Sequence, residues 1–139
     1  MPVSFVSERI SFECPNQERL EKWLTTVCSK ENKQVGDLTY IFCSDKYLLN
    51  INRKHLQHDF YTDVITFDYS EDNMVSGDVF ISIDRVKENA QSIGCPFIDE
   101  LHRVMVHGLL HLLGYNDKTA EEKSEMTEKE DCFLPLRSF

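Results

Sequence analysis

The sequence predicts an α+β fold in which one small mixed β-sheet of about four strands is covered by about five helices. Segments with strand-like and helix-like spacing of apolar residues follow each other in the order β-α-β-α-β-β-α-α-α. The chain has 139 residues and no internal repeat, low-complexity segment or Gly/Ser-rich linker, so we expect a single domain over residues 1–139. The helix expected after Pro96 is apolar enough to be the central helix on the sheet.

Two strands and two helices are expected in the first half of the chain. Val3–Phe12 alternates loosely between apolar and polar residues, as a strand with an irregularity would. Apolar residues then recur at helical spacing over Gln17–Lys30, a segment that a proline introduces. Leu38–Cys43 is rich in residues that favour strands. Ser44 is a suitable N-cap for a helix that continues to about Leu56.

Two strands and three helices are expected after a polar, aromatic connection over residues 57–63. The strands are Val64–Tyr69 and Asp78–Ile83, and the loop between them is long enough for a hairpin, with a parallel arrangement as the alternative. The next helix, residues 84–93, begins with an aspartate that can cap it and ends at a glycine. The helix after Pro96 follows, and a last acidic helix covers Ala120–Phe133.

The charge of the chain is strongly acidic. Acidic residues outnumber basic ones by 24 to 15, which gives a formal net charge of −9. Broad, non-specific nucleic-acid binding depends on neutralising phosphates, so this charge argues against it while permitting a local basic groove. The last expected helix holds six of the acidic residues, which we interpret as a solvated helix face: Glu121, Glu122, Glu125, Glu128, Glu130 and Asp131.

Neither the cysteines nor the N-terminal residues indicate secretion. The five cysteines are odd in number, scattered and without a Cys-x-x-Cys pair, so we expect neither a disulfide framework nor a zinc ribbon. We interpret all of them as reduced structural residues: Cys14, Cys28, Cys43, Cys95 and Cys132. The first residues lack the features of a signal peptide, and no apolar run approaches the ~18 residues of a membrane helix. We therefore expect a cytoplasmic protein.

The segment from Leu101 to Asp117 contains the candidate functional residues. His107 and His111 are four residues apart, so on a helix their imidazoles lie on one face and can converge. Gly114 is suited to end the helix, and the following turn can bring Asp117 back toward the histidines. Two imidazoles and a carboxylate form a divalent metal site with an open position for water. The alternative is a pair of core histidines, although imidazoles buried without partners are costly.

Four motifs, in the right order, resemble those of the YbeY family of rRNA maturation factors, which are metal-dependent endoribonucleases. Thr62–Phe67 is similar to the family's Thr-Asp-Val-Leu-Ser-Phe segment, with Tyr61 in place of the preceding proline. Gly77–Val79 resembles its Gly-Asp-Ile strand. His107–Tyr115 matches the family signature His-Gly-x-Leu-His-Leu-x-Gly-Tyr position by position. The trailing Glu-x-x-x-Met-x-x-x-Glu pattern matches Glu122, Met126 and Glu130.

This resemblance implies a single-strand-specific endoribonuclease that acts in 16S rRNA 3′-end maturation and ribosome quality control. It implies rRNA and the small ribosomal subunit or its proteins as partners, and one zinc ion per chain that activates a water. His107 and His111 match two family zinc ligands, whereas the third, a histidine in the family, falls on Asp117. A carboxylate is a harder, anionic ligand, so we expect lower Lewis acidity and more competition from other divalent metals.

The catalytic residues beyond the metal ligands are not identified by the resemblance. The family has an arginine upstream of the Thr-Asp-Val motif, and the spacing differs here; Arg53 is the nearest candidate, with an exposed helix residue as the alternative. Lys54 and Arg103 are the other basic residues whose positions suit stabilisation of charge on a phosphate. Asp63 and Asp78 each begin an expected strand and are candidates for a general base, with turn or cap roles as the alternative.

Three other functions share parts of this pattern. The His-x-x-x-His helix resembles that of metzincin peptidases, but these need Glu directly after the first His, where this chain has Gly108. Two histidines and one carboxylate also form the site of non-haem iron oxygenases, whose ligand spacing and scaffold differ. A non-catalytic small-subunit assembly factor with a structural metal is the remaining alternative, and the acidic charge suits docking to basic ribosomal proteins.

Overall fold

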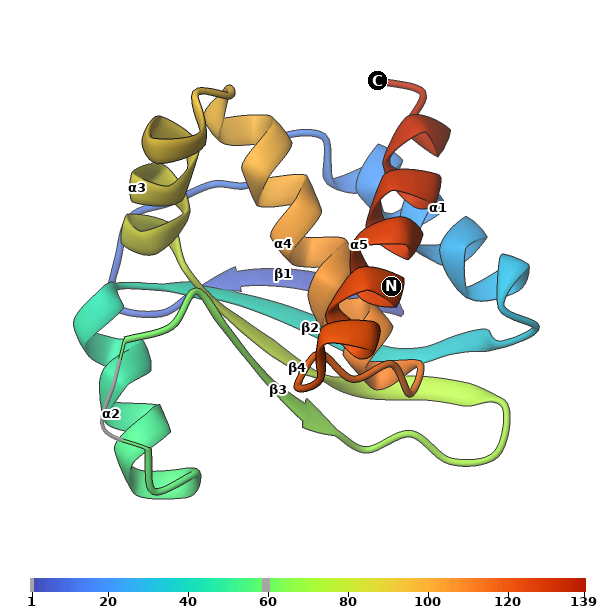
Figure 1. Ribbon diagram of the computed structural model, residues 1–139, viewed down its shortest axis with the longest axis horizontal. Helices are drawn as coiled ribbons and strands as arrows, with labels where there is room; N and C mark the ends of the chain where they lie inside the picture. The colour runs from blue at the N-terminus through green and yellow to red at the C-terminus, as the bar shows by residue number, and fades with distance from the viewer. Residues whose placement is uncertain (1, 59–60) are drawn as a thin grey trace.

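The computed structural model describes residues 2–58 and 61–139. Within these residues, four strands and five α-helices follow each other in the predicted order (Figure 1). The strands are β1 (Val3–Ser7), β2 (Gln34–Cys43), β3 (Val64–Asp68) and β4 (Met74–Ser82). The helices are α1 (Gln17–Lys30), α2 (Asp45–His55), α3 (Ile83–Ile93), α4 (Phe97–Leu112) and α5 (Ala120–Phe133), with a short 3-10 helix at Leu134–Leu136. The predicted α+β class is therefore confirmed.

The sheet is mixed, as predicted. Its strand order is β1-β2-β4-β3; β1 and β4 run parallel to β2, and β3 runs antiparallel to β4. β3 and β4 form the predicted hairpin, but its loop is shorter than expected, because Glu71 and Met74 bond to each other and β4 begins at Met74. β1 and β3 are the outer strands of this sheet.

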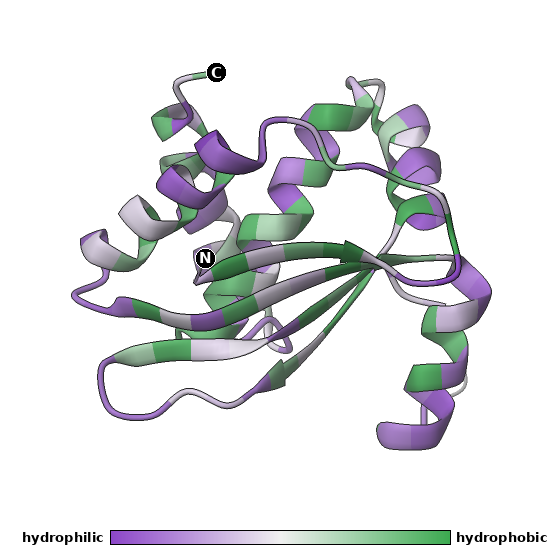
Figure 2. Ribbon diagram, turned by 180° about the vertical axis from the view of Figure 1, so that it is seen from behind, coloured by the Kyte–Doolittle hydropathy of each residue, from purple (hydrophilic) through white to green (hydrophobic). Residues whose placement is uncertain are grey.

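The helices cover the two faces of the sheet unequally. α1, α4 and α5 lie on one face, with α3 beside α4, whereas α2 lies on the opposite side at one end (Figure 1). Apolar residues gather in the strands and in α4, and hydrophilic residues in the outward parts of the other helices (Figure 2). The main core lies between the sheet and α4 and includes Leu38, Tyr40, Phe42, Val79, Ile81, Leu101, Met105 and Leu109; a smaller cluster beneath α2 contains Cys43, Leu48 and Ile65.

α4 is the central helix, as predicted, and it packs very close to the sheet. Leu101, Met105 and Leu109 are fully buried in it. At Gly108 the helix approaches β4 so closely that an added Cβ would lie 2.6 Å from the Cγ1 atom of Val79. This contact, which only a residue without a side chain permits, brings the carboxyl end of α4 down onto the β3–β4 hairpin.

The strand boundaries differ from the predicted ones. β1 ends at Ser7, because Arg9 takes a left-handed φ of 59° and the chain leaves the sheet there. β2 begins at Gln34, earlier than predicted, because Gln34 pairs with Met74 of β4. In both cases the boundary is decided by pairing or by a turn that the alternation of apolar residues does not encode.

The helix boundaries follow the predictions more closely. α1 and α5 occupy the predicted residues, and Ser44 caps α2 as expected. α3 begins one residue early, because its N-cap is Ser82, whose hydroxyl accepts a hydrogen bond from the Arg85 amide (3.1 Å), and not Asp84. Of the connection predicted over residues 57–63, residues 59–60 lie outside the described part of the chain.

α5 corrects the interpretation of the acidic residues near the C-terminus. Glu121, Glu125 and Glu128 are exposed, as a solvated helix face requires. Glu130, however, is only 6% exposed and lies on the inward face of the helix with Met126 and Phe133. Because acidic residues are so dense in this segment, its sequence does not indicate that one glutamate points inward.

The described residues contain no helix that is both long and apolar enough to cross a bilayer.

Candidate metal centre

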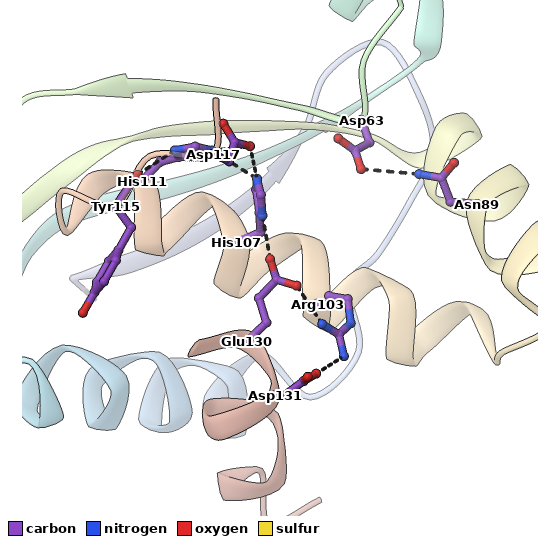
Figure 3. A network of polar contacts seen from close by, with 9 residues as sticks. All are labelled: Asp63, Asn89, Arg103, His107, His111, Tyr115, Asp117, Glu130 and Asp131. Atoms are coloured by element: carbon purple, nitrogen blue, oxygen red, sulfur yellow. Dashed lines mark hydrogen bonds and ion pairs between the residues drawn. The ribbon is translucent and has the colours of Figure 1, made fainter. Parts of the chain in front are cut away.

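The candidate site lies at the carboxyl end of α4. His107 and His111 are one turn apart on the same face of the helix, as their spacing predicted. Gly114 then takes a φ of 105°, the left-handed conformation that favours glycine, and ends the helix. The Tyr115 amide bonds back to a carbonyl in the last turn of α4 (3.0 Å), so the chain reverses. This reversal brings Asp117 next to the two imidazoles (Figure 3).

Three possible ligand atoms converge at one point. His107 Nε2 lies 3.1 Å from His111 Nε2, and Asp117 Oδ2 lies 3.2 Å and 3.4 Å from these two nitrogens. In a tetrahedral zinc site with bonds of about 2.0–2.1 Å, ligand atoms are separated by about 3.3 Å. The three atoms therefore have the spacing of one face of such a tetrahedron, and they leave a fourth position for water or substrate.

The second nitrogen of each imidazole has an acceptor that fixes its tautomer. His107 Nδ1 lies 2.6 Å from Glu130 Oε2, and His111 Nδ1 lies 3.0 Å from the Tyr115 carbonyl oxygen. With a proton on each Nδ1, the lone pairs of both Nε2 atoms face each other and the Asp117 carboxylate. These three electron-rich ligand atoms repel one another until a cation lies between them. The residues therefore fit a divalent metal.

A chain of charged groups continues behind His107. Arg103 Nη1 donates to Glu130 Oε1, and Arg103 Nη2 donates to Asp131 Oδ1, both at 2.7 Å (Figure 3). Arg103 was predicted to be one of three basic residues suited to stabilising a phosphate. It is instead held by two carboxylates behind His107 and does not line the groove that contains the ligand atoms. Its role in the structure is to orient Glu130.

The two histidines differ in their affinity for protons. Burial lowers the pKa of His107, but the hydrogen bond and charge of Glu130, together with Asp117 and Asp63, outweigh it and raise this pKa above its usual value. Burial and the neighbouring His107 lower the pKa of His111. A metal ion competes with protons for these nitrogens, so metal binding at this site is expected to depend on pH.

The ligand atoms open onto a groove of about 300 Å³. This groove runs along β3 to the end of α2. Its lining comprises Asn52, Leu56, His58, Thr62, Asp63, Val64, Ile65, Thr66, His107, His111 and Asp117.

The structure separates the two aspartates that were candidates for a general base. Asp63 lines the groove at the start of β3, where its carboxylate accepts a hydrogen bond from Asn89 Nδ2 (3.4 Å), and burial raises its pKa. Asp78 was predicted to begin a strand, but it lies in the middle of β4. It alternates with Val79, which is buried beneath α4, so its side chain is on the other face of the sheet.

The basic candidates near the groove lie at the end of α2. Arg53 and Lys54 are exposed in the last turn of this helix and are not among the residues that line the groove. His58 is exposed and lines it, whereas His55 packs edge-on against Phe67.

Sequence reasoning missed the residues that hold the turn between α4 and Asp117. Glu31, at the end of α1, accepts hydrogen bonds from the Tyr115 hydroxyl and from Lys129 Nζ, the latter at 3.2 Å. Lys129 Nζ also lies 5.5 Å from the centre of the Tyr115 ring. Glu31 and Tyr115 are 84 residues apart, so no local pattern indicates their contact. For Glu130 a signal existed, because Met126 and Glu130 are four residues apart on one helix face.

The close approach of α4 to the sheet also bears on the peptidase alternative. A metzincin-like enzyme needs a glutamate directly after the first histidine. That position is Gly108, where even a Cβ would lie 2.6 Å from a Val79 methyl carbon. A glutamate at this position would require the helix or Val79 to shift, and the chain lacks the general base that such peptidases need.

The cysteines do not contribute to this site. Burial raises the pKa of Cys14, Cys28 and Cys43 to about 12 in each case, so these thiols are protonated and unreactive. Cys95 is partly buried and Cys132 is exposed.

Comparison with known proteins gives consistent results over nearly the whole chain. Residues 4–136 match the family described as Endoribonuclease YbeY. A protein of that name from Cytophaga hutchinsonii is 51% identical over 138 residues, which cover 99% of this chain and 96% of that protein. One from Bacteroides thetaiotaomicron is 43% identical over 137 residues, covering 99% and 100%. A solution structure from Thermotoga maritima superposes with a TM-score of 0.66 at 27% identity, covering 95% of this chain and 86% of that one.

Proposed function

The chain belongs to the YbeY family of endoribonucleases, and from this membership we propose that it hydrolyses phosphodiester bonds in single-stranded RNA with the help of a metal ion. We further propose that it acts as a single domain in the cytoplasm, on the small ribosomal subunit or its proteins, in 16S rRNA 3′-end maturation and ribosome quality control. The observation that carries the proposal is the convergence of His107 Nε2, His111 Nε2 and Asp117 Oδ2 within hydrogen-bond distances at the end of a groove.

His107, His111 and Asp117 would hold one zinc ion per chain. When bound, this ion would polarise the scissile phosphate and lower the pKa of a bound water. Glu130 and the Tyr115 carbonyl keep protons on the two Nδ1 atoms, so that both Nε2 atoms remain available as ligands. Asp117 brings one negative charge that a third histidine would not, which leaves other divalent metals competitive at this site.

Metal content and RNA cleavage, measured on the same preparations, test this function. Wild-type protein purified without added metal is expected to contain about one zinc per chain and to cleave a single-stranded RNA. The His111→Ala variant is expected to lose both properties. His55→Ala, which removes an exposed histidine outside the groove lining, is the matched control. Full cleavage by His111→Ala would contradict the assignment of the site.

A non-catalytic assembly factor is the alternative: the net charge of −9 suits docking to basic ribosomal proteins, but the relatives of this chain are named endoribonucleases. The two candidates differ in their need for a partner. The enzyme is expected to cleave purified RNA alone when metal is present, whereas an assembly factor would bind ribosomal components without cleaving RNA.

A further inference from the structure

The two histidines of the candidate metal centre are held by acceptors of different kinds. His107 Nδ1 faces the carboxylate of Glu130, a buried residue of α5. His111 Nδ1 faces only a main-chain carbonyl, that of Tyr115, at 3.0 Å. This carbonyl lies beyond the end of α4, directly after Gly114, and a glycine leaves the neighbouring backbone free to rotate. The orientation of His111 therefore depends on what holds Tyr115.

Tyr115 is anchored through its side chain to two helices. The ring points away from the imidazoles (Figure 3), and its hydroxyl donates a hydrogen bond to Glu31 Oε1 at the end of α1. The other carboxylate oxygen of Glu31 accepts a hydrogen bond from Lys129 Nζ of α5, at 3.2 Å. Such charge-assisted hydrogen bonds are stronger than neutral ones, and the Glu31 side chain is only 16% exposed, so water competes weakly for it. Together these contacts fix the position of the Tyr115 ring.

The same anchor limits the movement of Asp117, two residues after Tyr115. Beyond Asp117 the chain enters the capping box of α5, in which the side chains of Thr119 and Glu122 each accept a hydrogen bond from the other residue's amide, at 3.0 Å. The chain from Tyr115 to Thr119 is therefore fixed at both of its ends. Release of the Tyr115 side chain would leave the first end held only by hydrogen bonds to the last turn of α4.

Two acceptors compete for the single proton of a neutral His111 imidazole. The Tyr115 carbonyl oxygen lies 3.0 Å from Nδ1, and Asp117 Oδ2 lies 3.4 Å from Nε2. Only a proton on Nδ1 leaves Nε2 free to bind a metal. The Asp117 carboxylate is the stronger acceptor because it is charged, so the carbonyl must be held in place to keep the proton on Nδ1. A displaced carbonyl would favour the tautomer in which Nε2 donates to Asp117 and cannot bind a metal.

We propose that Glu31 is a positioning residue of the candidate metal centre: through the Tyr115 hydroxyl, it fixes the carbonyl that keeps the proton of His111 on Nδ1. Glu130 has the corresponding role for His107, which it contacts directly. Glu31 lies outside the groove that contains the ligand atoms, so it acts without contacting metal or substrate. This inference deepens the proposed function and rests on it, because it requires a metal to be bound by His111.

Metal affinity tests the proposal, measured on the full-length protein by competition with a chromophoric chelator. Tyr115→Phe removes the hydroxyl but keeps the ring, and Glu31→Ala removes the acceptor of that hydroxyl. Each is expected to weaken zinc binding about tenfold, at the lower end of the effect of groups that orient metal ligands. Glu18→Ala, in the exposed first turn of α1, makes the same change in net charge as Glu31→Ala and is expected to leave the affinity unchanged.

Two further variants separate the hydrogen bond of Glu31 from its charge. Glu31→Gln removes the charge but keeps an oxygen that can accept from the Tyr115 hydroxyl, so it is expected to bind zinc more tightly than Glu31→Ala. The double variant Tyr115→Phe/Glu31→Ala is expected to bind no more weakly than the weaker of the two single variants, because both remove the same contact. Additive losses, or equal losses in Glu31→Gln and Glu31→Ala, would overturn the proposal.

Proton NMR of the zinc-loaded protein provides a readout that a general loss of stability would not reproduce. Each zinc-bound imidazole carries one Nδ1 proton, which its acceptor protects from exchange with solvent. In Tyr115→Phe and Glu31→Ala, the Nδ1 proton of His111 is expected to exchange at least about tenfold faster than in the wild type, because the Tyr115 carbonyl is no longer fixed. The Nδ1 proton of His107, held by Glu130, is the internal control and is expected to exchange at the wild-type rate.

The outcomes distinguish this proposal from the proposed function. If the wild-type protein binds zinc and cleaves RNA, but Tyr115→Phe and Glu31→Ala behave like Glu18→Ala, the proposal is overturned and the proposed function stands. Faster exchange at both histidines would also overturn the proposal, because Glu31 would then stabilise the fold as a whole. If the expected changes are found in a protein that binds zinc but does not cleave purified RNA, the proposal stands and the proposed function fails. A wild-type protein that binds no metal would overturn both.

Discussion

At the scale of single residues, the candidate metal centre depends on groups that are not metal ligands. His107 has Glu130 on its Nδ1, and Glu130 in turn is held by Arg103. Glu130 is buried, so its negative charge acts on His107 through a medium that screens it poorly. This charge makes His107 a stronger donor to a metal, and the hydrogen bond fixes the direction of its lone pair.

Replacing Glu130 with glutamine is therefore expected to weaken metal binding by about 10–100-fold, with the fold retained. Glu125→Gln, on the exposed face of the same helix, makes the same change in charge and is expected to leave the affinity unchanged. Competition with a chromophoric chelator measures both variants. Equal affinities for the two variants would show that Glu130 does not support the metal ligand.

The residues of the site differ in how far they can be predicted from sequence. The convergence of His107 and His111 follows from their helical spacing, and the return of Asp117 toward them follows from the turn that Gly114 predicts. Arg103 was assigned to a phosphate, because its ion pairs with Glu130 and Asp131 join helices whose packing no local pattern specifies. The contact of Glu31 with Tyr115 depends in the same way on how α1 packs beside α5.

At the scale of elements, helices were predicted better than strands. The ends of α1 and α5 follow from capping and periodicity, which are properties of a few neighbouring residues. The start of β2 depends on the pairing of Gln34 with Met74, the first residue of β4. These two residues are 40 positions apart in the chain. The mixed sheet itself was predictable because the order of elements limits how short connections can join them.

The contact of α4 with β4 leads to a prediction about stability. Gly108→Ala is expected to lower the free energy of unfolding by about 1–3 kcal/mol, although alanine favours helix more than glycine does. The reason is the 2.6 Å approach of the new Cβ to Val79 Cγ1, which pushes the helix away from the sheet. Urea denaturation measures the effect.

A double-mutant cycle isolates this contact. Val79→Ala removes the methyl groups that the new Cβ would meet, so the double variant is expected to be at least about 1 kcal/mol more stable than the sum of the single effects predicts. Strict additivity would show that the close approach does not determine the effect of the glycine substitution.

At the scale of the whole molecule, the end of α4 remote from the metal site joins the C-terminal residues to the core. His102 is 2% exposed and contacts the rings of Trp23 and Phe139. Its Nδ1 accepts a hydrogen bond from Arg137 Nη1 (2.8 Å), and Arg137 also pairs with Asp99. Burial first, and then the charge of Arg137, lower the pKa of His102 to about 4.

This lowered pKa makes stability depend on pH. The unfolded state binds a proton at His102 near pH 6.5, whereas the folded state resists it down to about pH 4, so stability is lost as the pH falls between these values. We expect the wild-type protein to lose about 2 kcal/mol between pH 7 and pH 5 relative to His102→Gln, which does not titrate there. Urea denaturation of the wild type and of the variant at saturating metal gives both curves. The metal occupies His107, so that His107 does not titrate in either protein. Parallel curves would contradict the prediction.

Removal of the metal separates a catalytic from a structural role across the whole molecule. The main core joins the sheet, α1 and α4 through residues that are fully buried without any contribution from the ligand atoms. The three candidate ligands lie at the surface end of α4, with side-chain exposures of 22%, 24% and 38% for His107, His111 and Asp117. Chelation is therefore expected to abolish RNA cleavage while near-ultraviolet circular dichroism remains native, with cleavage restored when zinc is returned.

A structural zinc contributes about 10–16 kcal/mol to folding in small domains, more than most single domains can lose. Cooperative unfolding on chelation would contradict the catalytic assignment and favour an assembly factor with a structural metal.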